Sequence, residues 1–176
     1  MLDRAEQHAL ADWTCASLAS TRVPAPRGGP DVGLNPTDRG KQGSKIHQLV
    51  DGQGLPLGVT ISGAYVHDEW RFEQTLDAVQ GMRNGRQGRP RRRLDKLYDD
   101  KAYDARRRRR ACRTLGIKAR IARWSQDSRE RLGRWRWCVK RTLSWVLAFR
   151  KLAVRRERSS AAFLALCQVA CAMIVW

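Results

Sequence analysis

Acidic residues are scarce in the second half of this 176-residue sequence. Residues 89–176 hold 7 Asp/Glu against 26 Lys/Arg, whereas residues 1–88 hold 10 against 9, so the halves carry net charges of +19 and −1. This split indicates a polyanionic partner, most simply nucleic acid. An alternative stays open, because 28 of the 35 basic residues are Arg, a bias that GC-rich coding produces without selection for binding.

The sequence also lacks a disulfide or zinc framework. Its five Cys are odd in number and include no CxxC pair, so reduced thiols in a cytosol are expected. The spacing of Cys167 and Cys171 indicates packing on one helical face and not a metal site. The N-terminus lacks the apolar run of a signal peptide. The apolar stretch 161–176 is 16 residues long, shorter than the roughly 20 needed to cross a bilayer, and predicts a buried terminal helix.

The length fits one domain with a core of its own. Apolar periodicity and turn residues predict the following elements in order. The expected strands are 18–23, 45–50, 57–62, 96–99 and 117–122. The expected helices are 2–11, one capped by Asp68 and running to Val79, 103–115 ending at Gly116, 133–152 and 158–175. The expected loops are 24–43, the Asp51-Gly turn at 51–54, a mobile Gly/Arg-rich insert near 81–93, and 124–132. This order predicts an α/β fold with a mixed sheet, three antiparallel strands followed by parallel ones, flanked by helices.

Five segments carry a family resemblance. They are residues 17–23 (SLASTRV), 35–51 (NPTDRGKQGSKIHQLVD), 63–79 (GAYVHD followed by TLDAV), 97–104 (LYDDKAYD) and 134–145 (RWRWCVKRTLSW). In this order they resemble the DDE transposases of bacterial insertion sequences. The resemblance covers nearly the whole chain and implies a ribonuclease H-like fold.

The resemblance also implies a chemistry. In the family three carboxylates hold two Mg²⁺ ions, which activate the attacking oxygen and stabilise the leaving one during DNA cleavage and strand transfer. Asp100 matches the second aspartate and is the one expected catalytic and metal-binding residue. Ala19 stands where the first aspartate belongs, and Lys140 where the glutamate belongs. The ligand set is therefore expected not to bind Mg²⁺, and a Lys140–Asp100 ion pair is expected in its place.

Nucleic-acid contacts are expected from Lys45, Arg134, Trp135, Arg136 and Arg141. Arginines interleaved with tryptophans can clamp and stack on single-stranded or distorted DNA.

Two further pairs of residues have alternative interpretations. For Trp137 and Trp145, eight residues apart, a buried position is the preferred interpretation, and binding is the alternative. His47 and His67 could act as catalytic bases, but a structural role is preferred.

The sequence therefore predicts a truncated, degenerate transposase. Residues 1–17 are expected to be the remnant of an N-terminal helical region, and residues 18–176 the ribonuclease H-like domain. The expected partner is DNA at transposon ends, with no membrane, and a homodimer is a further option; the expected location is the cytoplasm, in association with the nucleoid. A catalytically dead protein that occludes transposon ends and an active nuclease with recruited ligands remain as alternatives.

Overall fold

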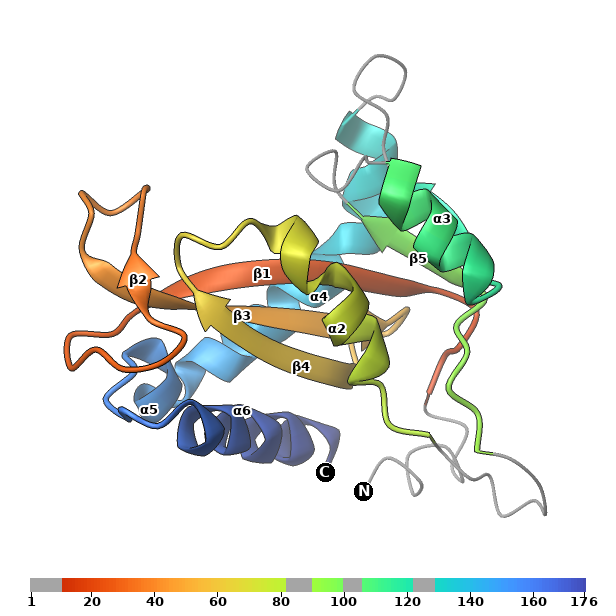
Figure 1. Ribbon diagram of the computed structural model, residues 1–176. Helices are drawn as coiled ribbons and strands as arrows, with labels where there is room; N and C mark the ends of the chain where they lie inside the picture. The colour runs from red at the N-terminus through yellow and green to blue at the C-terminus, as the bar shows by residue number, and fades with distance from the viewer. Residues whose placement is uncertain (1–10, 82–89, 100–105, 122–128) are drawn as a thin grey trace.

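A computed structural model describes residues 11–81, 90–99, 106–121 and 129–176, with only the helical course of residues 129–135 (Figure 1). The predicted helix 2–11 falls almost entirely outside this range, as do most of the insert near 81–93 and Asp100. The described elements form a mixed sheet with helices on both faces, so the predicted fold class is confirmed.

The sheet is built around a long central strand, β1 (Ala16–Pro24). On one side β1 pairs antiparallel with β3 (Gln42–Asp51), which in turn pairs with β4 (Pro56–Gly63) and the short β2 (Gly33–Leu34). On the other side β1 pairs parallel with β5 (Lys96–Asp99), and β5 pairs parallel with β6 (Lys118–Ile121). The predicted β3–β4 hairpin is confirmed: Asp51 Oδ1 accepts from the backbone N–H groups of Gln53 and Leu55, which fixes the turn.

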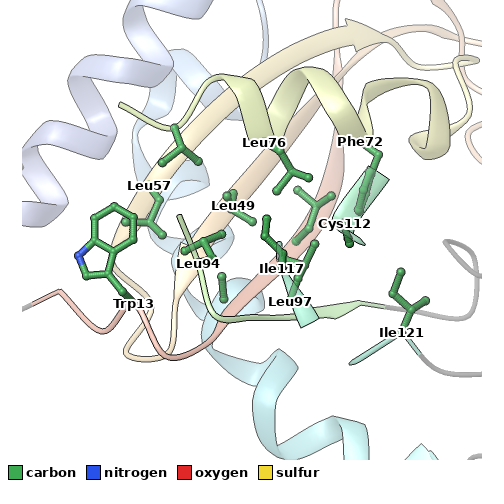
Figure 2. Close-up of a cluster of buried hydrophobic side chains, with 13 residues drawn as sticks. Trp13, Leu49, Leu57, Phe72, Leu76, Leu94, Leu97, Cys112, Ile117 and Ile121 are labelled. Carbon is green, nitrogen blue, oxygen red and sulfur yellow. The ribbon is translucent and has the colours of Figure 1, made fainter. Parts of the chain in front are cut away.

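One face of the sheet is covered by three short elements. They are the 3₁₀ turn η1 (Asp68–Arg71), α2 (Phe72–Asp77) and α3 (Arg106–Thr114). Figure 2 shows apolar side chains from these helices meeting side chains of the strands, among them Leu49, Leu97 and the fully buried Phe72. Trp13 belongs to the same cluster. The packed core therefore begins before residue 18, where the domain boundary was predicted.

The opposite face is covered by α4 (Arg129–Ala148), α5 (Arg150–Ala153) and α6 (Ser160–Val175). Alternation along the strands decides which residues face these helices, because successive side chains point to opposite faces. Thus Leu18 belongs to the α2 side, whereas Ala19 packs on α4. Helix α6 lies along β4 (Figure 1). Its buried side chains include Phe163, Cys167 and Cys171, so the predicted packing role of the two cysteines is confirmed.

Helix α6 is buried on one side only. Val169, Met173 and Trp176 are exposed, which the uniformly apolar sequence did not predict. No helix among the described residues is long and apolar enough to span a bilayer.

Three predicted boundaries are corrected. Helix α4 begins at Arg129, inside the predicted loop 124–132. The helix predicted over 133–152 is interrupted at Phe149, whose extended backbone (ψ 111°) separates α4 from α5. Asp68 does not cap the helix that follows: the cap position is His67, without a side-chain hydrogen bond, and Asp68 binds Lys45 instead. Gly116 does end α3, with a φ of 68° that favours glycine.

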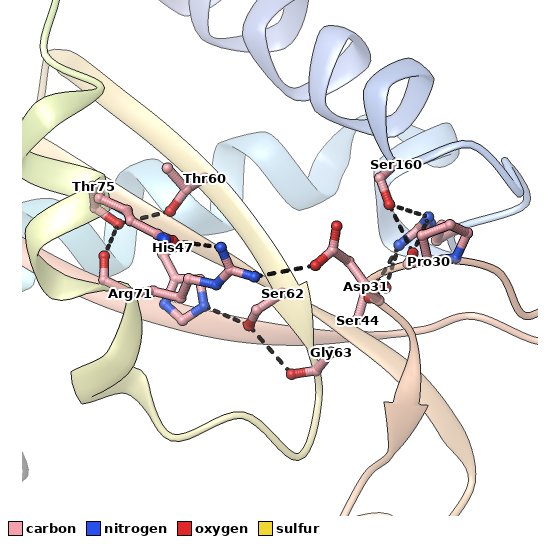
Figure 3. Close-up of polar contacts among 12 residues, drawn as sticks. Pro30, Asp31, Ser44, His47, Thr60, Ser62, Gly63, Arg71, Thr75 and Ser160 are labelled. Atoms are coloured by element: carbon pink, nitrogen blue, oxygen red, sulfur yellow. Dashed lines mark hydrogen bonds and ion pairs between the residues drawn. The ribbon is translucent and has the colours of Figure 1, made fainter.

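Arg155 ties the C-terminal helices to the first loop. Its guanidinium donates to the carbonyl oxygens of Pro30, Asp31, Glu157 and Arg158 and to the hydroxyls of Ser44 and Ser160. Figure 3 shows Pro30, Asp31, Ser44 and Ser160 meeting at this point. The side chain is 1% exposed, so these bonds replace all of its contact with water.

Candidate active site

Ala19 lies in the middle of the sheet, beneath α4. It is buried in a small apolar cluster with Val50 of β3 and with Cys138, Val139 and Leu143 of α4. The first of the three positions that the resemblance singles out therefore has an apolar environment. A methyl group packs there without cost, whereas a carboxylate would lose its hydration.

Lys140 lies on the same turn of α4 that packs against Ala19. Its neighbour Val139 is fully buried, while Lys140 itself is exposed. At 100° per residue, Lys140 falls on the flank of the helix that also carries Arg136 and Leu147. The opposite flank carries Thr142, whose hydroxyl donates to the Gly54 carbonyl at 2.6 Å in the β3–β4 turn. The strand and the helix thus bring the Ala19 and Lys140 positions into one region.

The third position, Asp100, lies outside the described residues, and so does the expected Lys140–Asp100 ion pair. The structure ends β5 at its neighbour Asp99, which is buried on the α3 side of the sheet. Burial raises the pKa of the Cys112 thiol to about 11, and the nearby Asp99 carboxylate adds to this effect. Asp99 therefore belongs to the face opposite Ala19.

The residues at these positions do not fit the two-metal site that the resemblance implies. Ala19 offers no ligand atom and is surrounded by apolar side chains, and the ammonium of Lys140 repels a cation. Among the residues that the structure describes, no group of three or more His, Cys, Asp or Glu side chains could hold a metal ion. Asp100 is the one oxygen ligand left of the three family positions.

A buried polar network lies on the other face of the sheet, beneath η1. Lys45 is 2% exposed, and its ammonium donates to the carbonyl of Val66 and to Asp68 Oδ1 at 2.8 Å. The hydrogen bond and charge of Lys45 lower the pKa of Asp68, although burial alone would raise it. The prediction that Lys45 binds nucleic acid is therefore wrong, because its charge is used inside the protein.

His47 belongs to the same network. Its Nε2 lies 2.8 Å from Ser62 Oγ, and its Nδ1 lies 3.9 Å from Asp68 (Figure 3 shows the His47–Ser62 contact). Burial lowers the pKa of His47 to about 4; Asp68 opposes this shift, while Lys45 and Arg71 reinforce it. A neutral, 1% exposed imidazole is a structural group.

Stability should consequently depend on the titration of His47. The pKa of His47 is lower in the folded state than in the unfolded chain, where it is about 6.5. Between these two values the unfolded chain binds a proton that the folded protein does not, so acid favours unfolding. The contribution of His47 to the free energy of unfolding should be constant above pH 7 and fall as the pH drops from about 6.5 towards 4, by about 2 kcal/mol at pH 5. Denaturant titrations of wild type and His47→Gln measure this. The variant should lose that part of the slope, and equal slopes would contradict the assignment.

Part of the charge of the basic half is also used within the fold. Arg108 is 3% exposed, pairs with Glu69 and stacks on Phe72. Arg109 donates to the carbonyl of Ile121. Other basic side chains of this half are exposed and remain available to an anionic partner: Arg106, Arg110, Arg113, Lys118, Arg120, Lys140, Arg150, Lys151, Arg156 and Arg158.

The remaining predicted nucleic-acid contacts lie on α4. Arg134 and Trp135 fall in the part of the helix whose side chains are not described. Arg136 is half-buried. The guanidinium of Arg141 lies between two indole rings, 4.3 Å from the centroid of Trp137 and 4.7 Å from that of Trp145.

The preferred interpretation of Trp137 and Trp145 as buried residues is wrong. They are 51% and 45% exposed. The buried stripe of α4 is Val139, Leu143 and Val146, which lies on another side of the helix. A spacing of eight residues indicates that two side chains lie on the same side of a helix. It does not indicate whether that side meets the sheet or the solvent. The arginine placed four residues from each tryptophan was the available signal, since stacking on a guanidinium suits the solvent side of a helix.

Comparison with known proteins agrees with this geometry. A family model described as "Transposase DDE domain" matches residues 3–175. A protein of Burkholderia cepacia, described as a putative transposase for insertion sequence element IS402, is 39% identical over 149 residues, which cover 85% of this chain and 70% of the relative. The chain therefore belongs to the DDE transposases of insertion sequences.

Proposed function

We propose that this chain is a transposase-derived domain that binds DNA but no longer catalyses cleavage or strand transfer. One observation carries the proposal. Ala19 is surrounded by apolar side chains, and Lys140 lies on the turn of α4 that packs against it. DDE transposases depend on divalent metals, and the ancestral reaction acts on DNA. Here two of the three ligand positions cannot coordinate a cation, whereas many basic side chains are exposed.

The electrostatic part of the proposal predicts steep salt dependence. Neutralising 6–10 phosphates releases condensed counterions, so affinity for a short duplex should fall by about 10³–10⁵ between about 50 and 200 mM salt. Fluorescence anisotropy with a labelled duplex measures this. Affinity that stays constant over this range would contradict an electrostatic interface.

A pair of matched variants locates the interface. Lys140→Ala with Lys151→Ala removes two exposed charges from the second half of the chain, and should reduce the slope of log affinity against log salt by about 2. Arg27→Ala with Lys41→Ala removes two exposed charges from the first half of the chain and should leave the slope unchanged. Equal effects of the two pairs would mean that binding is not localised to the basic half.

Occlusion of transposon ends is the second candidate function. It requires a folded domain, which the packed core and the hydrogen bonds of Arg155 support. Selective binding would require an affinity for terminal repeats about 10³-fold or more above that for scrambled duplex. Equal affinities would leave only non-selective binding. In both cases we propose a single ribonuclease H-like domain, whose packed core includes Trp13 and strand β1.

A further inference from the structure

Helix α4 presents two tryptophans to solvent in the basic half of the chain. Trp137 and Trp145 are half exposed, although large aromatic side chains are usually buried. They are eight residues apart, so about two helical turns, or roughly 12 Å along the axis, separate them.

Arg141 holds the two rings in place. Its guanidinium stacks on both indoles and also donates to the carbonyl of Gln53 in the β3–β4 turn. Arg141 is therefore held by a hydrogen bond to the β3–β4 turn while its guanidinium stacks on the two indole rings. The tryptophans are in this way ordered before any ligand arrives, which reduces the entropy lost on binding.

The sequence around the two rings is cationic, which suits a polyanion. Residues 136–153 contain Arg136, Lys140, Arg141, Arg150 and Lys151 and no acidic residue. A cationic surface of this kind disfavours a second copy of a chain with a net charge of +18. The combination of ordered aromatic rings with cations is the arrangement that binds unpaired nucleotides: the rings stack on bases while the cations attract the phosphates.

We propose that Trp137 and Trp145, spaced by Arg141, form a stacking site for unpaired bases of DNA. The site gives the domain a preference for single-stranded or distorted DNA over regular duplex, in which the bases are already stacked on one another. This inference rests on the proposed DNA-binding function and specifies the form of DNA that the domain binds.

The test compares single-stranded and duplex DNA of equal length and equal salt. Full-length wild type and the Trp137→Ala/Trp145→Ala variant are titrated with each, and one strand carries 2-aminopurine, whose fluorescence is quenched by stacking. The double variant should bind single-stranded DNA about tenfold or more weakly and lose the quenching, because stacking on an aromatic ring contributes this much per base. Its affinity for duplex should change by no more than about twofold, since phosphate contacts dominate there.

Two controls separate stacking from general effects. Trp70 is 66% exposed but lies on η1, which covers the face of the sheet opposite α4, so Trp70→Ala should change neither affinity. Trp137→Phe/Trp145→Phe keeps aromatic rings and should keep most of the single-strand affinity. Circular dichroism confirms that each variant is folded.

Four outcomes would overturn the inference. Undiminished single-strand binding by the double alanine variant would show that the rings do not stack on bases. An equal loss for both DNA forms would assign them a structural role. A shift from dimer to monomer in sedimentation, with unchanged DNA affinity, would make the face a protein interface. Wild type that binds neither DNA form would remove the proposed function itself, and the inference with it.

Discussion

Replacing Ala19 by aspartate and Lys140 by glutamate together is expected to create a divalent-cation site. With Asp100, the double variant has three carboxylates at the family positions. Wild type has one carboxylate and a lysine, a net charge near zero. A unit charge pair at 4 Å is worth about 4 kcal/mol at an effective dielectric near 20, which corresponds to about three orders of magnitude in affinity. Calorimetric titration with Mn²⁺ should therefore give measurable binding for the double variant only.

Each single reversion should do little, because an incomplete ligand set does not hold the ion. The matched control is Ala19→Asn with Lys140→Gln, which supplies similar shapes and oxygen atoms without negative charge. It should bind Mn²⁺ far more weakly than the carboxylate pair. Wild type binding Mn²⁺ as tightly as the double variant would show that other ligands have been recruited, and would end the proposal that catalysis is lost.

The reversion also has a cost in stability. Ala19 is 8% exposed among apolar side chains, so an aspartate there loses hydration until a cation arrives. Ala19→Asp should therefore lower the thermal midpoint in the absence of metal, and Mn²⁺ should raise the midpoint of the double variant. Lys140→Glu should have little effect on stability, since position 140 is exposed.

Arg155→Met is expected to destabilise the protein by about 3–5 kcal/mol. The substitution removes six hydrogen bonds of an arginine that is 1% exposed. The carbonyls of Glu157 and Arg158 lose their donor, which is costly for buried groups, while those of Pro30 and Asp31 keep the bonds from Ser160 and Ser44. The substitution also removes stacking on Phe163, whose ring centroid lies 5.1 Å away. Guanidinium chloride titration measures the change.

Arg155→Lys should recover little of this loss, because an ammonium cannot reach acceptors on both sides as a planar guanidinium does. Arg156→Met is the matched control: the neighbouring side chain is exposed, so stability should change by less than about 0.5 kcal/mol. Similar losses in both methionine variants would show that the Arg155 hydrogen bonds contribute no more than a surface charge.

Local sequence features predicted the elements that depend on local interactions. The Asp51-Gly turn, strand β5 and the end of α3 at Gly116 are confirmed, since each is fixed by its own backbone conformation or alternation. Asp68 was assigned to a cap because its position before a helix allows one. Its actual partner, Lys45, lies 23 residues away, and a pairing between distant segments leaves no local pattern.

Some features of the candidate site could likewise be predicted from the sequence, and others could not. The Ala19 and Lys140 positions come together because β1 and α4 pack, an arrangement that the family resemblance implied. The exposure of Trp137 and Trp145 was missed, since helical spacing alone does not determine which side of α4 meets the sheet. Likewise, no local pattern distinguishes the buried Arg108 and Arg155 from exposed arginines. Only the packed acceptors around them do so.

The position of α6 has a consequence during synthesis. Strands β1, β3 and β4 are complete by residue 63, but α6, whose side chains pack on Val23, Ile46, Val59 and Ile61, comes last among the described elements. A nascent chain therefore carries an apolar sheet face without this cover until α6 leaves the ribosome. A premature stop codon before Ser160 would make that exposure permanent. The product would be a target for chaperones and proteases even though every strand of the sheet is present.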